Sequence, residues 1–205
     1  MRLGLFGGSF DPVHFGHLLL AESCREQLAL DQVWFMPAAV PPHKRDAHLT
    51  EASKRVDMLR LATGGEPAFV VSTLELDRGG VSYTIDTLGE IRDQLPDSEI
   101  FLLLGSDSLA ELTTWREPRR ICELATPVAV RRPGSAAADF AALAEYVSPG
   151  RLSAIRDHSV EMPLVNFSAS DIRGRVAAGK SIRYRTPRAV EQYIAHNRLY
   201  LPSGG

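Results

Sequence analysis

The sequence lacks any long apolar run, and it holds only two cysteines among its 205 residues. A helix that crosses a bilayer needs roughly 20 predominantly apolar residues, so we expect no membrane span and no membrane partner. Two cysteines are too few for a disulfide framework. Cys24 and Cys122 lie on expected helix faces, which predicts reduced core residues of a cytoplasmic protein. The formal net charge of only −2 argues against a nucleic-acid partner.

Short apolar segments alternate with amphipathic ones along the chain, which is typical of an α/β fold with a parallel sheet covered on both faces. Strands are expected at residues 2–6, 32–36, 69–72, 99–104 and 127–130, and helices at 16–30, 51–62, 85–95 and from Pro118 onward. Residues 135–143 are expected to form a surface connection that leads into a helix. Thr186 is expected to cap the last helix and Pro187 to begin it. We expect one domain over residues 1–205, with ligands beyond the carboxyl ends of the strands.

The most informative segment joins the first expected strand to the first expected helix. It reads Gly7-Gly8-Ser9-Phe10-Asp11-Pro12-Val13-His14-Phe15-Gly16-His17. Glycines allow close approach to the backbone, and a helix N-terminus offers free N–H groups and partial positive charge, so the segment predicts a phosphate site. Two histidines three residues apart can face one anion. The alternatives are a turn-capping pair or a metal pair, for which no nearby His or Cys completes a ligand set.

This His-x-Gly-His motif after a glycine-rich strand resembles the nucleotidyltransferase superfamily that shares it with class I aminoacyl-tRNA synthetases. The longer string is similar to the bacterial nicotinate-nucleotide adenylyltransferase family. Further matching segments follow in order at residues 41–44, 78–88, 104–109, 115, 132–134, 167–173 and 193–200. The resemblance covers nearly the whole chain. It implies a Rossmann-like doubly wound parallel sheet with a small C-terminal helical part at about residues 168–205.

The same resemblance implies an activity. AMP would pass from ATP to nicotinate mononucleotide, giving nicotinate adenine dinucleotide and pyrophosphate in NAD biosynthesis, with Mg²⁺ carried by ATP. It leaves a monomer or a homo-oligomer open. The runner-up activities are another adenylyltransferase, acting on phosphopantetheine or nicotinamide mononucleotide, and a non-catalytic nucleotide-binding module.

The resemblance also assigns residues. The implied catalytic residues are His14, His17, Lys44 and Arg173. The implied ATP contacts are Gly7, Gly8, Ser9, Phe10, His14, His17, Gly105, Asp107, Ser168, Ser170, Ile172 and Arg173. The implied nicotinate mononucleotide contacts are Gly8, Ser9, Lys44, Tyr83, Thr84 and Trp115. No residue is assigned as a metal ligand.

Elementary chemistry supports several of these assignments. Ser168 or Ser170 can cap a helix, and Arg173 offers a planar charged fork for phosphate. An indole can stack on a pyridine ring, while the helix start near Thr84 can hold its carboxylate. Asp107 can accept hydrogen bonds from a ribose or help to place magnesium, or it can be a turn-forming aspartate. Ala169 and Pro118 depart from the family pattern, which has a serine and often a tryptophan there.

A second phosphate motif competes with the first. Residues 174–181 match the Walker A pattern, so a P-loop ATPase is a rival. A P-loop follows a buried strand and opens a helix, whereas this segment is expected to end a helix at Gly179. The context therefore favours a helix end, with Lys180 in the following turn.

Overall fold

The computed structural model describes residues 1–40, 49–131 and 140–202, with only the backbone of Ser106 and Asp107. In these ranges six strands form one sheet in the order β3-β2-β1-β4-β5-β6. The strands are β1 (Arg2–Gly8), β2 (Gln32–Pro37), β3 (Phe69–Val71), β4 (Glu99–Gly105), β5 (Thr126–Arg131) and β6 (Val160–Glu161). All neighbours pair in parallel. The chain order reverses between β1 and β4, which confirms the Rossmann-like doubly wound sheet.

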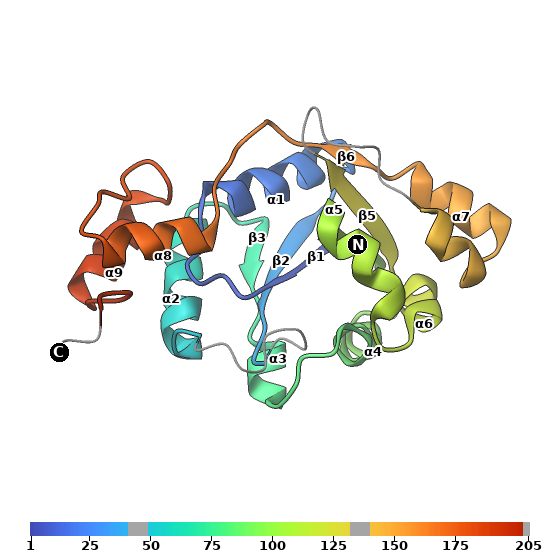
Figure 1. Ribbon diagram of the computed structural model, residues 1–205. Coiled ribbons are helices and arrows are strands. Elements are labelled where there is room, and N and C mark those ends of the chain that lie inside the picture. The colour runs from blue at the N-terminus through green and yellow to red at the C-terminus, as the bar shows by residue number, and fades with distance from the viewer. Residues whose placement is uncertain (41–48, 132–139, 203–205) are drawn as a thin grey trace.

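Helices cover both faces of the sheet (Figure 1). They are α1 (Phe15–Gln27), α2 (Ala52–Thr63), α3 (Leu74–Arg78), α4 (Thr84–Gln94), α5 (Ser106–Glu111), α6 (Pro118–Leu124), α7 (Pro149–Arg156), α8 (Ala169–Ala177) and α9 (Arg188–His196). The described residues also form the short 3₁₀ turns η2 (Leu112–Thr114) and η3 (Ala141–Glu145). Among the helices that the structure describes, none is long and apolar enough to span a membrane.

The core has two parts, one on each face of the sheet. Strand β4 contributes to both, because its successive side chains point to opposite faces: Phe101 and Leu103 pack with α1, α2, α8 and α9, and Leu102 and Leu104 pack with α4, α6 and α7. A strand that is buried on both faces explains the uninterrupted apolar run in this segment. Cys24 and Cys122 are free and buried, as predicted.

The elements expected from the sequence are present, and their bounds agree within a few residues. One local prediction is wrong. Thr186 does not cap the last helix, because its hydroxyl donates to the backbone oxygen of Val13 at 2.7 Å. Pro187 is the N-cap residue of α9, and the helix begins at Arg188. The pattern also missed α3, α5 and β6. The expected connection at 135–143 lies mostly outside the described residues, and the expected helix after it corresponds to α7.

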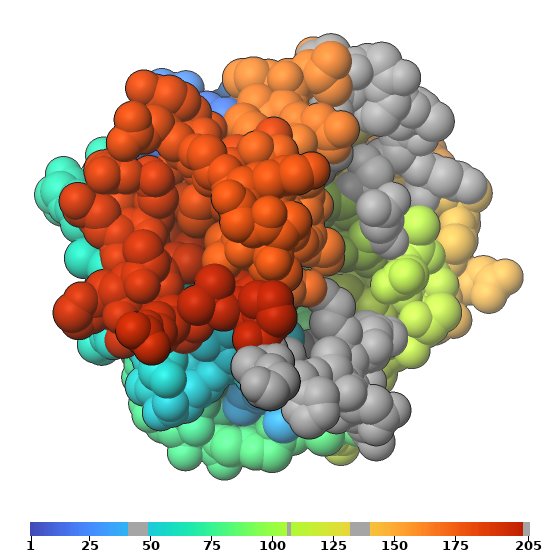
Figure 2. Space-filling model, turned by 60° about the vertical axis from the view of Figure 1, so that its left-hand side comes forward, coloured from blue at the N-terminus to red at the C-terminus, as the bar shows by residue number. Residues whose placement is uncertain are grey.

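The C-terminal helices lie against the first half of the chain. Helix α9 packs beside α2, and Phe15 at the start of α1 donates its N–H to the Arg185 oxygen at 3.2 Å. Figure 2 shows the C-terminal segment as a continuous layer next to α2. The residues after 168 therefore cover the loop that leads into α1. The single-domain organisation stays a prediction.

Candidate active site

The two motif histidines lie side by side at the start of α1. His14 is the N-cap residue, and its ring stacks on that of His17 with a centroid separation of 3.7 Å and 19° between the planes. The His14 backbone N–H donates to Nδ1 of His17 at 3.2 Å. The spacing of three residues thus brings both imidazoles to one helix N-terminus, as the sequence predicts.

The surroundings of His17 determine its charge and which ring nitrogen carries its proton. Burial, together with the neighbouring His14 ring, holds the pKa of His17 well below its ordinary value of 6.5. Because Nδ1 accepts the hydrogen bond from His14, the neutral ring carries its proton on Nε2. At neutral pH His17 is therefore an uncharged donor through Nε2.

Glycines in the motif make room for rings as well as for a ligand. A Cβ on Gly16 would lie 3.0 Å from Nδ1 of His14, and one on Gly8 would lie 3.0 Å from the Phe10 ring. A Cβ on Gly7 would meet nothing within 4 Å. A side chain at Gly8 or Gly16 would therefore press on a ring of the loop, whereas Gly7 leaves its backbone open.

Helix α8 presents its first turn to the same loop. Ser168 is its N-cap residue, and the Ser168 hydroxyl accepts from the Asp171 N–H at 3.1 Å. The guanidinium of Arg173 donates from Nη1 to the backbone oxygen of Asp11 at 2.7 Å and from Nη2 to the Ser170 hydroxyl at 3.4 Å. Arg173 therefore lies at the predicted phosphate loop, although it is 162 residues away in sequence.

Three of the predicted ATP contacts are buried: His14, which is 6% exposed, and the apolar Phe10 and Ile172. Phe10 is 1% exposed, and its ring lies edge-on to His17 at 5.1 Å between centroids. Ile172, on the buried face of α8, is fully enclosed in the core. Any contact that these two residues make with a nucleotide would therefore run through their backbone.

A buried network that sequence reasoning missed holds the loop in place. The Asp11 carboxylate, 2% exposed, accepts from the Thr50 N–H at 3.0 Å and from the Tyr200 hydroxyl at 2.6 Å. The equally buried Arg55 donates to the backbone oxygens of Ser9, Ala38 and Thr50, each at 2.9 Å. Burial, together with the hydrogen bond to Asp11, raises the pKa of Tyr200. The sequence holds one signal of this network: Arg55 lies on the apolar face of the helix expected at residues 51–62.

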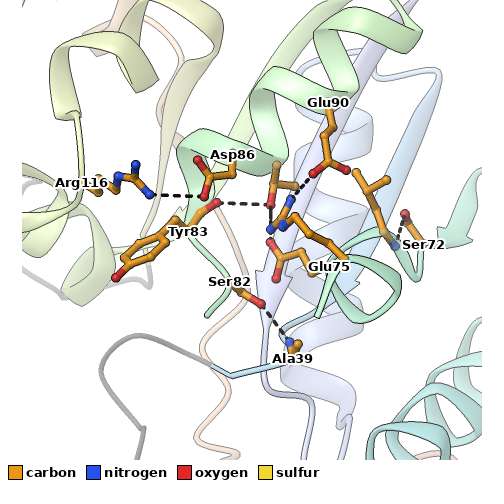
Figure 3. Close-up of polar contacts among 11 residues, drawn as sticks. Ala39, Ser72, Glu75, Ser82, Tyr83, Asp86, Glu90 and Arg116 are labelled. Atoms are coloured by element: carbon orange, nitrogen blue, oxygen red, sulfur yellow. Dashed lines mark hydrogen bonds and ion pairs between the residues drawn. The ribbon is translucent and has the colours of Figure 1, made fainter. Parts of the chain in front are cut away.

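The segments assigned to the mononucleotide form a pocket at the same edge of the sheet. Tyr83 is the N-cap residue of α4, Thr84 begins the helix, and Trp115 follows η2. The pocket encloses about 160 Å³ and is lined by Ser82, Tyr83, Thr84, Thr114, Trp115, Arg116 and Ile121. Figure 3 shows how Ser82 and Tyr83 lie between the end of β2 and α4.

A larger cavity connects this pocket to the glycine loop. It encloses about 310 Å³, shares Ser82, Thr84 and Trp115 with the pocket, and is also lined by Gly7, Gly8, Ser9 and Gly105. It lies at the carboxyl ends of β1 and β4, where the strand order reverses and ligands of doubly wound sheets bind. The structure therefore brings the two predicted subsites together.

The pocket also contains groups that sequence reasoning did not select. The Arg116 guanidinium lies 5.0 Å above the Tyr83 ring and 3.5 Å from the Asp86 carboxylate. The Trp115 indole N–H is buried and has no hydrogen-bond partner among the described residues. The Ser82 hydroxyl accepts a hydrogen bond from the Ala39 N–H at 2.9 Å. This bond links the segment that follows β2 to the pocket.

Two assigned side chains are not described. Lys44 lies outside the described residues, and Asp107 is placed by its backbone alone, in the first turn of α5. In the described parts of the chain, no group of three or more His, Cys, Asp or Glu side chains is arranged to hold a metal ion.

The rival P-loop interpretation is wrong. Residues up to 177 are helical in α8, Gly179 follows with a φ of +65°, and Lys180 is exposed. A P-loop needs these residues between a buried strand and a new helix. The Walker-like string is a helix end.

Comparison with known proteins identifies the family of this chain. Residues 5–175 match the model of a family described as cytidylyltransferase-like. A probable nicotinate-nucleotide adenylyltransferase of Thermomicrobium roseum is 45% identical over 199 residues, which cover 97% of this chain and 91% of the relative. A counterpart in Thermus thermophilus is 45% identical over 200 residues, covering 98% and 100%.

Among solved structures, the Plasmodium falciparum nicotinic acid mononucleotide adenylyltransferase complexed with NaAD superposes with a TM-score of 0.74. It is 16% identical and covers 97% of both chains. At this identity the likeness shows a shared fold, while the closer relatives show the family. The chain belongs to the cytidylyltransferase-like family and, within it, to the nicotinate-nucleotide adenylyltransferases.

Proposed function

We propose that this protein transfers AMP from ATP to nicotinate mononucleotide and releases pyrophosphate, forming nicotinate adenine dinucleotide. The observation that carries the proposal is the stacked His14–His17 pair at the α1 N-terminus. It ends the glycine loop, and Gly7, Gly8 and Ser9 of that loop line a cavity that continues into the Tyr83–Trp115 pocket. The relatives that are 45% identical over nearly their full length have names with this activity. A solved neighbour of the same fold is complexed with the dinucleotide NaAD.

The chemistry requires alignment and charge compensation. An oxygen of the mononucleotide 5′-phosphate bonds to the α-phosphorus of ATP, and the bond from that phosphorus to the bridging oxygen of the β-phosphate breaks. The attacking oxygen is already anionic, so no proton has to be removed and no general base is needed. Donors and cations must stabilise the charge that develops on the leaving pyrophosphate.

The residues at the α1 N-terminus fit this requirement. His17 donates through Nε2 while it remains neutral, and the helix N-terminus adds partial positive charge. Arg173 already lies against the loop at Asp11, so its guanidinium can share a phosphate contact. We assign the phosphates of ATP to His14, His17, Arg173 and the α8 N-terminus, with Lys44 as a further cation. Gly7, Gly8, Ser9, Gly105 and Asp107 border the nucleotide.

Magnesium belongs with the substrate in this scheme. The ATP phosphates supply oxygen ligands, which Mg²⁺ prefers. When bound, the ion neutralises charge on the triphosphate. The protein residues then hold and orient the complex.

The pocket between Tyr83 and Trp115 suits the pyridine ring. An indole face stacks on a flat ring, and the first turn of α4 at Thr84 offers backbone N–H groups to a carboxylate. The amide analogue would bring its own NH₂ toward these donors. An unpaired buried donor costs about 1–3 kcal/mol, so we expect the acid to be preferred roughly 5- to 150-fold in kcat/KM.

The test measures pyrophosphate release from ATP with a panel of acceptors. The panel holds nicotinate mononucleotide, nicotinamide mononucleotide, phosphopantetheine and a sample without acceptor. We expect the first to give the highest kcat/KM and the last to give no release. Release without an acceptor would indicate an ATPase, and a preference for phosphopantetheine would select the other adenylyltransferase. We further propose that the enzyme acts in the cytoplasm, and light scattering will distinguish a monomer from a homo-oligomer.

A further inference from the structure

A buried carboxylate borders the cavity, and the reaction described above does not use it. Glu75 lies in α3 and is 7% exposed. It lines the larger cavity together with Ser82, Thr84 and Trp115, the residues shared with the pyridine pocket. Burying a charged group costs free energy unless a partner compensates the charge. Because Glu75 borders a ligand cavity, a bound ligand can be that partner.

The protein holds this carboxylate by one oxygen. The Thr87 hydroxyl donates to Oε1 of Glu75 at 2.8 Å, and the same hydroxyl accepts from Nη2 of Arg78 at 3.0 Å. Arg78 also donates from Nη1 to Glu90 at 2.7 Å. Figure 3 shows Glu75 between these bonds and Ser82. The other Glu75 oxygen accepts no hydrogen bond from any side chain or backbone group in the described part of the chain.

The charges of this network leave an excess of one negative charge. Two carboxylates, Glu75 and Glu90, face one guanidinium, that of Arg78. Arg78 bonds directly to Glu90 and reaches Glu75 only through the Thr87 hydroxyl. The side of the network that borders the cavity is therefore the negative side.

The mononucleotide assigned to this cavity carries the complementary charge. Its pyridine nitrogen is bonded to the ribose carbon as well as to two ring carbons, which makes the ring a permanent pyridinium cation. An aromatic face such as Trp115 attracts a cation, and a carboxylate with a free oxygen attracts it more strongly. We propose that Glu75 is a specificity-determining residue whose carboxylate balances the positive charge of the pyridinium ring. This inference rests on the proposed function.

The test compares Glu75→Gln with Glu90→Gln on two acceptors. Glutamine retains an oxygen that can accept from Thr87 but removes the charge. Glu90 contacts the same arginine but lines neither cavity, so its variant controls for disturbance of the network. The acceptors are nicotinate mononucleotide and its 1,4-dihydro form, which has the same ribose, phosphate and carboxylate but an uncharged ring.

We expect Glu75→Gln to raise KM for nicotinate mononucleotide about tenfold, with KM for ATP within about twofold and KM for the dihydro form unchanged. Glu90→Gln should behave like the wild type. An equal rise for both acceptors would overturn the proposal, because it would indicate a ribose contact or a structural role. No change for either acceptor would overturn it too.

The wild type gives an independent measurement if the variant does not fold. It should bind the cationic ring about tenfold more tightly than the dihydro ring, and equal KM values would contradict the inference. Failure of the proposed function is distinguishable, because the wild type would then release no pyrophosphate with either acceptor. Wild-type turnover with an unaltered Glu75→Gln profile would refute the role of Glu75 alone.

Discussion

Replacing Tyr200 with phenylalanine tests how the C-terminal residues support the nucleotide loop. The change removes one oxygen, which donates a 2.6 Å hydrogen bond to the Asp11 carboxylate. Asp11 is 2% exposed, so water cannot readily take the place of the lost donor. Asp11 retains the Thr50 N–H on its other oxygen at 3.0 Å. The substitution therefore removes the hydrogen bond to a buried carboxylate, together with the weaker contact of the Tyr200 hydroxyl with the Thr50 side chain.

A hydrogen bond to a charged group contributes about 1.5–3 kcal/mol to the free energy of unfolding. For a chain of this size each kcal/mol shifts the Tm by about 2–4 °C. We therefore expect Tyr200→Phe to lower the Tm by about 3–12 °C in a calorimetric or fluorescence melt. Turnover measured well below the transition should also fall, because the backbone oxygen of Asp11 holds Arg173.

The matched control is Tyr193→Phe, which removes a hydroxyl that donates to Asp57 at 2.8 Å. Tyr193 and Asp57 are only half-buried, so the expected loss is about 0.5–1.5 kcal/mol, with no effect on turnover. The reasoning is refuted if the two variants lower the Tm equally, or if Tyr200→Phe leaves the free energy of unfolding unchanged.

The site itself supports four more predictions. His17→Ala should lower kcat about 100- to 1,000-fold without unfolding the protein, and near-normal kcat would contradict the assigned donor role. Because the pKa of His17 is lower in the folded than in the unfolded chain, the unfolded chain binds its proton first as the pH falls through 6.5. The free energy of unfolding should therefore fall from about pH 7 to about pH 5, and His17→Gln should reduce this loss in urea titrations. Arg173→Ala should raise KM for ATP markedly while Lys180→Ala leaves it unchanged, and the reverse result would restore the P-loop. A chelator should abolish pyrophosphate release without changing the Tm, and excess Mg²⁺ should restore activity; a lowered Tm would point to a resident structural metal.

The fold was predictable where secondary-structure patterns are long. The apolar run in β4 and the stripe of α1 extend over enough residues for periodicity to identify them. Helices α3 and α5 have five and six residues, and β6 has two. Segments that short complete too few turns or alternations to show a period. Their positions are decided by tertiary contacts, which is why the pattern missed them.

The site was predictable where its geometry is local. The His14–His17 pair follows from spacing and a helix start, since residues three apart lie on one face of a turn. The buried partners are different. Arg55 reaches Ser9 across 46 residues and Ala38 across 17, and no local pattern records which carbonyls a buried guanidinium will meet. In the sequence, Glu75 likewise looks like an ordinary helix carboxylate. Only the folded structure shows that it lies beside Thr87 and borders the cavity.

The matching segments are far apart in sequence, and the structure gives a physical reason why three of them occur together. The first segment supplies Asp11, the segment at 167–173 supplies Arg173, and the tail supplies Tyr200. All three meet at one residue: Arg173 donates to the Asp11 backbone oxygen, and Tyr200 donates to its carboxylate. A change at any of them leaves a buried polar atom without its partner, at a cost that falls on the phosphate loop itself. Arg173 and Tyr200 thus hold the N-terminal loop at one residue, so a change in the tail is expected to reach that loop even though Tyr200 is not assigned a substrate contact.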